Sequence, residues 1–173
     1  MPLPQPYKQQ RVYSVGEGAN MLFHERKSPR IPQYDYSTPN YYFITICTEN
    51  KACLFWSNQQ LNSLGIIAEE CLKKIPVIYP NVELDKYVVM PNHIHAILVI
   101  KDEKDIQSDI RQIIGQYKMS VTKKIHENKP DLPVWQRSFY DYIIRSYNGY
   151  LKIWNYIDGN PAKWEADCFY QAD

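Results

Sequence analysis

The sequence predicts an α+β domain in which an antiparallel sheet is covered by helices. Short runs rich in β-branched and aromatic residues alternate with longer segments whose apolar residues recur every three or four positions. With 173 residues, 45% of them hydrophobic, the chain is long enough to bury one sizeable core. We therefore expect a single sheet-and-helix domain rather than several small ones.

The first half of the chain predicts a strand, a helix and a strand hairpin. Residues 41–48 form the β-branched and aromatic run YYFITICT, which is typical of a buried strand. Residues 58–75 have the apolar spacing of a helix, which Pro76 is expected to end. Two strands over residues 83–90 and 93–100 follow, joined at Pro91-Asn92 by a tight turn.

The second half completes a recognisable order. It predicts a helix over residues 108–127, a strand over residues 139–145 and a helix over residues 147–159, which Asn160-Pro161 ends. Strand, helix, strand, strand, helix, strand is the ferredoxin-like, split βαβ order, here with an added C-terminal helix. One sheet face in such a fold stays free to carry a site. The fold alone does not decide the function.

Residues 1–40 predict an extended arm ahead of one domain over residues 41–173. The arm is rich in proline, glycine and polar residues, and it carries Arg26, Lys27 and Arg30 followed by Tyr34 and Tyr36. Basic residues interleaved with aromatic ones suit single-stranded nucleic acid, because they can meet phosphates and stack on bases. A solvated, loosely held terminus is the alternative interpretation.

Charge is segregated along the chain although its net value is only +1. Residues 111–152 contain eight lysine or arginine residues against three acidic ones, a local charge of +5. The candidate DNA contacts in this stretch are Arg111, Lys118, Lys123, Lys124 and Lys152. A solvated helix face is again the alternative.

Several protein classes are disfavoured by composition. No segment approaches the roughly 20 apolar residues of a membrane span, and residues 1–10 are too polar for a signal peptide. The four cysteines show no CxxC spacing, so neither a zinc cluster nor a disulfide framework is indicated. We expect a cytoplasmic protein with reduced thiols.

The most informative feature is a pair of histidines at the start of an apolar strand. His93 and His95 are separated by one residue, so both project from one face of the sheet and can hold one divalent cation. Two packed and hydrogen-bonded rings without a ligand are the alternative. On the third helix, Tyr156 and Asn160 are four residues apart and share a side. They could bring a nucleophile and a third metal ligand to the histidines, although a chain with 15 tyrosines can offer such a pair by chance.

Four segments in one order resemble a known family. They are YFITICT at residues 42–48, VMPNHIH at residues 89–95, WQRSFYD at residues 135–141 and YIDGNPAKW at residues 156–164. Together they are similar to the HUH single-tyrosine transposases (IS200-like transposases), and within them to the REP-associated branch. The resemblance extends over residues 30 to about 168.

The resemblance implies an endonuclease that cuts and rejoins single-stranded DNA near hairpins through a 5′-phosphotyrosine, as in DNA transposition. By position, Tyr156 would be the nucleophile, and His93, His95 and Asn160 would hold a divalent metal, Mg²⁺ or Mn²⁺. The implied partner is single-stranded DNA with a hairpin. The implied protein is a cytoplasmic, nucleoid-associated monomer or homodimer.

Three other functions fit parts of the pattern. A domesticated DNA-binding protein would keep the fold and lose cleavage, a relaxase or replication initiator would share the histidine motif, and a ferredoxin-like RNA-binding module would show exposed aromatic residues on its central strands. The chain also departs from the family by carrying Tyr142 where many relatives have a histidine. If that histidine assists proton transfer in the relatives, this protein would either be slower or use another group.

Overall fold

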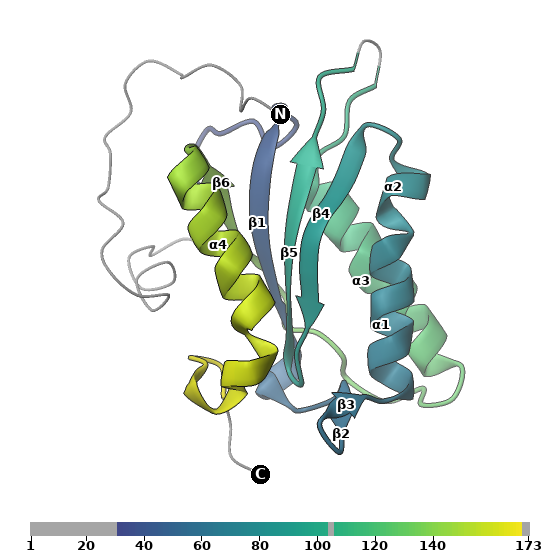
Figure 1. Cartoon of the computed structure of the whole chain (residues 1–173). Helices are drawn as coiled ribbons and strands as arrows, with labels where there is room; N and C mark the ends of the chain where they lie inside the picture. The colour runs from purple at the N-terminus through teal and green to yellow at the C-terminus, as the bar shows by residue number, and fades with distance from the viewer. Residues whose placement is uncertain (1–30, 104–105, 171–173) are drawn as a thin grey trace.

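The computed structural model describes residues 31–103 and 106–170. Its main sheet has four antiparallel strands in the order β4-β5-β1-β6 (Figure 1). The strands are β1 (Asn40–Cys47), β4 (Val82–Val89), β5 (His93–Ile100) and β6 (Tyr140–Ile144). The helices are α1 (Ser63–Lys73), α2 (Ile75–Ile78), α3 (Ile110–His126) and α4 (Tyr147–Gly159). This arrangement confirms the predicted ferredoxin-like split βαβ fold with an added C-terminal helix.

The central strand β5 separates two apolar clusters because its side chains alternate between faces. All eight of its residues are buried. Ile94, Ala96 and Leu98 pack with α1 and α3 on one face. Ile97 and Val99 pack on the other face with Ile153 and Ile157 of α4. Helices α1 and α3 therefore cover one face of the sheet and α4 covers the opposite face (Figure 1).

The first helix is shorter than its apolar spacing predicts. Residues 56–61 instead form a small hairpin of β2 (Trp56–Ser57) and β3 (Gln60–Leu61), whose turn residues Asn58 and Gln59 have φ values of 50° and 61°. Asn62 then accepts hydrogen bonds from the backbone N–H groups of two residues in the first turn of α1, so the helix begins after it. The expected end was also wrong, because Pro76 lies in the first turn of the short helix α2.

The described part of the expected arm is not extended. Residues 31–39 form turns, and Tyr36 is only 2% exposed, with its hydroxyl donating to Asp141 on β6 at 3.0 Å. Tyr36 therefore belongs to the core and has no face open for a base. Arg26, Lys27 and Arg30 lie outside the described residues.

Substitution of Gly65 on α1 would test how closely this helix packs against the backbone at Phe55. A Cβ at this position would lie 2.3 Å from the carbonyl oxygen of Phe55, so we expect Gly65→Ala to lower the free energy of unfolding by about 1–3 kcal/mol. Gly115 on α3 is the matched control, since a Cβ there meets nothing within 4 Å and alanine should stabilise the helix by about 1 kcal/mol. Urea unfolding measures both changes, and equal effects of the two substitutions would contradict the packing described for α1.

Candidate functional site

Both histidines lie at the start of β5, on the sheet face that α4 covers. Their imidazole rings are fully buried, and the ring centroids are 4.5 Å apart. Cys47 and Thr45 on β1 are their cross-strand partners, so the neighbouring strand forms one side of the site. The alternation of side chains along the strand therefore places the histidines together as predicted.

Each histidine is held through its Nδ1 atom. The Nδ1 of His95 lies 2.8 Å from the hydroxyl of Thr45, and the Nδ1 of His93 lies 2.9 Å from the side-chain oxygen of Asn92. The Nε2 of His93 is buried and has no hydrogen-bond partner in the part of the chain that the structure describes. A buried ring nitrogen without a partner is costly unless a ligand satisfies it.

Helix α4 brings Tyr156 and Asn160 to the histidines. The Tyr156 hydroxyl lies 3.2 Å from the Nε2 of His95. Asn160 follows the last turn of α4, is 3% exposed, and its side-chain oxygen likewise has no hydrogen-bond partner among the described residues. The structure thus brings together the predicted metal ligands and the predicted nucleophile.

Asp167 completes this cluster, although no pattern in the sequence predicted its position there. After the 3₁₀ turn at Pro161–Ala166, its Oδ2 atom accepts hydrogen bonds from the Tyr156 hydroxyl (3.0 Å) and from the amide nitrogen of Asn160 (2.9 Å). One ligand atom each from His93, His95 and Asp167 lie within 4.8 Å of one another, so these residues can hold a metal ion. Asp167 lies six residues after Pro161 in a segment without periodicity, so the sequence alone showed only its charge.

Phe169 covers the histidines from the C-terminal side. Its ring centroid lies 4.6 Å from that of His93 and 6.1 Å from that of His95. Its backbone N–H donates to Asp167 Oδ1 at 2.7 Å, and the Lys51 ammonium lies 5.2 Å from its ring centroid. The segment from Asp167 to Phe169 is therefore tied to the site by both side-chain and backbone contacts.

Burial keeps both histidines neutral. Desolvation lowers the pKa of His93 to about 3, with a smaller contribution from the Lys51 ammonium. The pKa of His95 also lies well below its usual value, because burial and the neighbouring His93 outweigh the opposite effect of Asp167. Neutral imidazole is the form that binds metal ions.

The Tyr156 hydroxyl is harder to ionise than a free phenol. Burial raises its pKa, and the negative charge of Asp167 raises it further. Without a nearby cation or a proton acceptor, this tyrosine is therefore a weak nucleophile at neutral pH.

Acid should destabilise the protein through His93. An unfolded histidine takes up a proton below a pH of about 6.5, whereas the folded ring does so only near pH 3, so the unfolded state binds more protons between these values. The free energy of unfolding should fall by about 2 kcal/mol from this residue alone by pH 5. Urea unfolding between pH 7 and 4 should show a shallower decline for His93→Gln, and an identical decline would contradict a buried neutral ring.

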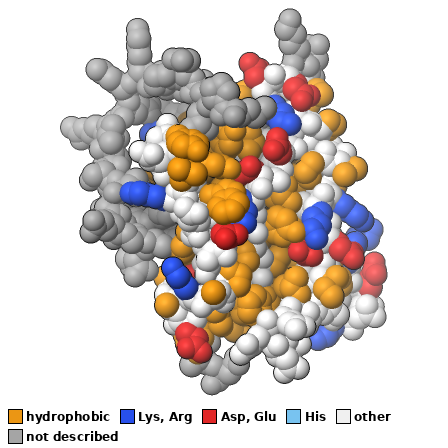
Figure 2. All heavy atoms as spheres, in the orientation of Figure 1, with side chains coloured by type: hydrophobic (Ala, Val, Ile, Leu, Met, Phe, Trp, Pro, Cys, Tyr) orange, Lys and Arg blue, Asp and Glu red, His pale blue; other side chains and the backbone are white. Residues whose placement is uncertain are grey.

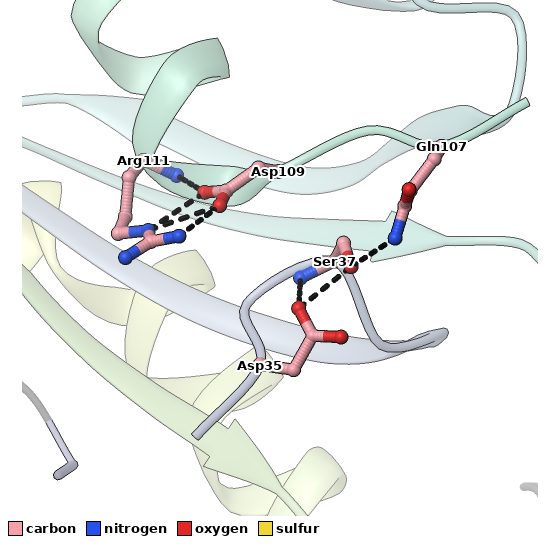
Figure 3. Close-up of polar contacts among 5 residues, drawn as sticks. All are labelled: Asp35, Ser37, Gln107, Asp109 and Arg111. Carbon is pink, nitrogen blue, oxygen red and sulfur yellow. Dashed lines mark hydrogen bonds and ion pairs between the residues drawn. The ribbon is translucent and has the colours of Figure 1, made fainter. Parts of the chain in front are cut away.

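Four of the five described basic residues that are predicted to contact DNA do not join this cluster. Arg111, Lys118, Lys123 and Lys124 belong to α3, which packs on the sheet face opposite α4. The guanidinium of Arg111 pairs with Asp109 at the start of α3, next to a contact between Ser37 and Gln107 (Figure 3). Lys152, in contrast, is an exposed residue of α4, one turn before Tyr156.

Lys118 and Lys124 also have partners within the chain. The Lys118 ammonium donates to the carbonyl oxygens of Gln136, Arg137 and Ser138 at 2.5, 3.2 and 3.4 Å. Lys124 lies 3.8 Å from the carboxylate of Glu70 on α1. Figure 2 shows basic and acidic side chains interspersed with apolar ones on the face that it presents. Among the helices of the described residues, none is both long and apolar enough to span a bilayer.

Comparison with known proteins places this arrangement in a family. The family model described as "Transposase IS200 like" matches residues 37–160. An uncharacterised protein of Haemophilus influenzae strain Rd is 36% identical, and the match covers 87% of this chain and 96% of that protein.

Two solved structures share the fold. The structure of a REP-associated tyrosine transposase bound to a REP hairpin has a TM-score of 0.59 at 23% identity, covering 78% of this chain and 73% of that one. A candidate transposase from Deinococcus radiodurans R1 has a TM-score of 0.51 at 16% identity, covering 75% of this chain and 97% of that one. Since the family model matches residues 37–160, which is most of the sequence, the chain belongs to the IS200-like transposase family.

Proposed function

We propose that this protein is a metal-dependent endonuclease that cuts and rejoins single-stranded DNA next to hairpins, with Tyr156 as the nucleophile. The observation that carries the proposal is the position of the Tyr156 hydroxyl, 3.2 Å from His95, in a cluster with two buried polar atoms that have no hydrogen-bond partner among the described residues. Those two atoms are the Nε2 of His93 and the side-chain oxygen of Asn160. Both are of the kinds that ligate divalent cations, and both come from residues that the sequence predicts as ligands.

The donor set fits a cation with nitrogen and oxygen ligands. His93 and His95 would offer ring nitrogens and Asn160 its amide oxygen, with the Asp167 carboxylate close enough to contribute. When bound, Mg²⁺ or Mn²⁺ would neutralise charge on the scissile phosphate and lower the pKa of a nearby phenol. Neutral histidines support this assignment, because no proton has to leave a charged ring before the cation binds.

The proposed reaction exchanges one phosphodiester for another. The Tyr156 oxygen forms a bond to the phosphorus, and the bond from phosphorus to the 3′ oxygen of the preceding nucleotide breaks. The leaving 3′ oxygen takes up a proton and becomes a 3′-hydroxyl. Since the covalent intermediate keeps a phosphodiester, attack by a 3′-hydroxyl on the tyrosine linkage can rejoin the strand.

Asp167 is the nearest acceptor for the phenolic proton. The Tyr156 hydroxyl already donates to its Oδ2 atom at 3.0 Å, so the proton can move along an existing hydrogen bond as the phenol attacks. The amide nitrogen of Asn160 donates to the same oxygen and fixes its position. This carboxylate would be the other group that assists proton transfer in a chain that has Tyr142 where many relatives have a histidine.

The hairpin partner is proposed from the fold and from the charges near the site. The REP-associated transposase that shares the fold was solved with a REP hairpin, and this supports a hairpin substrate for this chain. We propose that Lys152 contacts the DNA backbone close to the scissile phosphate, because it is exposed on the helix of Tyr156. The α3 residues Arg111, Lys118, Lys123 and Lys124 would contact more distant phosphates. We also propose DNA contacts for Arg26, Lys27 and Arg30, which lie outside the described residues.

The described site draws its residues from one chain. Tyr156 reaches His95 of the same chain because the connection from β6 to α4 is only Arg145-Ser146. We therefore propose that a monomer contains a complete site, and that any dimer forms without exchanging α4.

A cleavage assay with hairpin oligonucleotides tests the proposed function. Labelled single strands from the DNA that flanks the gene, with a hairpin and with a scrambled stem, would be incubated with Mn²⁺, with Mg²⁺ or with EDTA. We expect cleavage that requires both a cation and the hairpin. Tight hairpin binding without cleavage under any condition would favour the domesticated DNA-binding protein instead.

A further inference from the structure

Asn92, in the turn between β4 and β5, connects three segments of the site. Its amide nitrogen donates to the carbonyl oxygens of Lys51 at 3.1 Å and of Phe169 at 2.8 Å. Its side-chain oxygen faces the Nδ1 of His93 at 2.9 Å. The side chain is fully buried, so these contacts are not exchanged with water.

The two carbonyl groups determine which way the Asn92 amide points. A carbonyl oxygen only accepts hydrogen bonds, so the NH₂ group and not the side-chain oxygen must face Lys51 and Phe169. The side-chain oxygen of Asn92 is then directed at His93, and it too can only accept. The Nδ1 of His93 must therefore carry a hydrogen. The other ring nitrogen is the buried Nε2, which has no hydrogen-bond partner among the described residues.

The local backbone is shaped to hold one of these carbonyls in place. Asn50 and Lys51 adopt the left-handed region, with φ values of 52° and 55°, which is uncommon for residues other than glycine. The amide hydrogen bond from Asn92 ties down the Lys51 carbonyl that follows this bend. The turn, the bend and the C-terminal segment therefore all meet at one side chain.

We propose that Asn92 is a positioning residue that fixes the His93 ring with its hydrogen on Nδ1 and so presents Nε2 to the cation. The inference rests on the proposed function, because it assigns Asn92 a part in forming that metal site. His95 differs, since its Nδ1 contacts the hydroxyl of Thr45, which both donates and accepts. Thr45 therefore holds the His95 ring in position without determining which ring nitrogen carries the hydrogen. Asn92 determines both the position of the His93 ring and the nitrogen that carries its hydrogen.

Two measurements on Asn92→Ala test this role, and neither depends on cleavage. Long-range ¹H–¹⁵N NMR of metal-free protein reports which ring nitrogen carries the hydrogen, with the His93 signals assigned by their loss in His93→Gln. Calorimetric titration with Mn²⁺ reports affinity. We expect wild-type His93 to carry its hydrogen on Nδ1, and Asn92→Ala to lose this preference and to bind Mn²⁺ about 10–100-fold more weakly.

Asn81→Ala is the matched control. Asn81 is also buried, 1% exposed, and bonds Ser108 and Ile106 at the opposite end of the β4–β5 hairpin from the histidines. The Asn81→Ala variant should have a lower free energy of unfolding, as Asn92→Ala does, but it should keep the wild-type affinity for Mn²⁺. Asn92→Asp retains an acceptor for His93 but loses the donors to the carbonyls, so it should keep the hydrogen on Nδ1 and lose less affinity than alanine.

The outcomes separate this inference from the proposed function. A hydrogen on Nε2 in the wild-type protein, or wild-type Mn²⁺ affinity in Asn92→Ala, would overturn the role of Asn92. Even if Asn92→Ala does not fold, the wild-type NMR measurement still tests whether His93 carries its hydrogen on Nδ1, as the contacts of Asn92 require. If His93 carries its hydrogen on Nδ1 but neither the wild-type protein nor any variant binds Mn²⁺, the proposed metal-dependent function fails. The orientation of the ring by Asn92 would still stand.

Discussion

Tyr156→Phe should abolish strand cleavage and covalent capture of DNA, a loss of at least about 10⁴-fold, because no other atom can replace the attacking oxygen. Only a hydroxyl is removed, and the hydrogen bonds lost with it are those to His95 and Asp167. Hairpin affinity should therefore stay at the wild-type level, and the free energy of unfolding should change by about 1 kcal/mol. Cleavage by single-turnover kinetics and binding by fluorescence anisotropy measure the two effects separately.

Tyr150→Phe is the matched control for that substitution. Tyr150 lies on the same helix, and its hydroxyl also donates to a carboxylate, that of Asp85 on β4, at 2.9 Å. Losing this hydroxyl should leave the cleavage rate unchanged. Undiminished cleavage by Tyr156→Phe, or equal losses in the two variants, would move the nucleophile to another residue.

Asp167→Asn should slow cleavage by about 10²–10⁴-fold, the contribution expected of a proton acceptor. The substitution keeps the shape of the side chain but removes the negative charge that receives the Tyr156 proton. Loss of that charge also removes one cause of the raised pKa of Tyr156. The rate of the variant should therefore rise with pH, as hydroxide replaces the missing acceptor.

Asp158→Asn provides the comparison. Asp158 is exposed on α4 and pairs with Lys86, so it has the same charge without contact to the hydroxyl of Tyr156. Its substitution should not alter the pH profile. A wild-type rate and pH profile in Asp167→Asn would exclude Asp167 as the acceptor and leave it a structural role.

The fold could be predicted where periodicity was strong. Strand β5 and helix α4 begin and end at the predicted residues, because β5 is an apolar run that starts after a turn and α4 has helical spacing up to Asn160-Pro161. The start of α1 was missed because Leu61 has helical spacing but pairs across a strand hairpin with Trp56. Left-handed backbone at Asn58 and Gln59 decides between the two, and apolar spacing does not encode it.

The part of the site that depends on local spacing could also be predicted. A spacing of two residues on a strand places His93 beside His95, and a spacing of four on a helix places Tyr156 and Asn160 on one side of α4. The topology of the fold then brings the two pairs together. Thr45 depends on the register between β1 and β5, and Asp167 on an irregular turn after Pro161. Such contacts follow from tertiary structure rather than from a local pattern. The same reason explains why Tyr36, judged by composition, was wrongly placed in an open arm.

Mass spectrometry of the trapped intermediate would locate the nucleophile directly. Protein incubated with a hairpin oligonucleotide and Mn²⁺ would be digested with nuclease and trypsin, and the peptides carrying a residual nucleotide sequenced. Cleavage after Lys152 and Lys163 releases residues 153–163, in which Tyr156 is the only tyrosine. We expect the nucleotide on Tyr156 of this peptide, with no adduct when EDTA replaces the metal. A nucleotide on any other residue, or cleavage with no covalent adduct, would contradict the proposed mechanism.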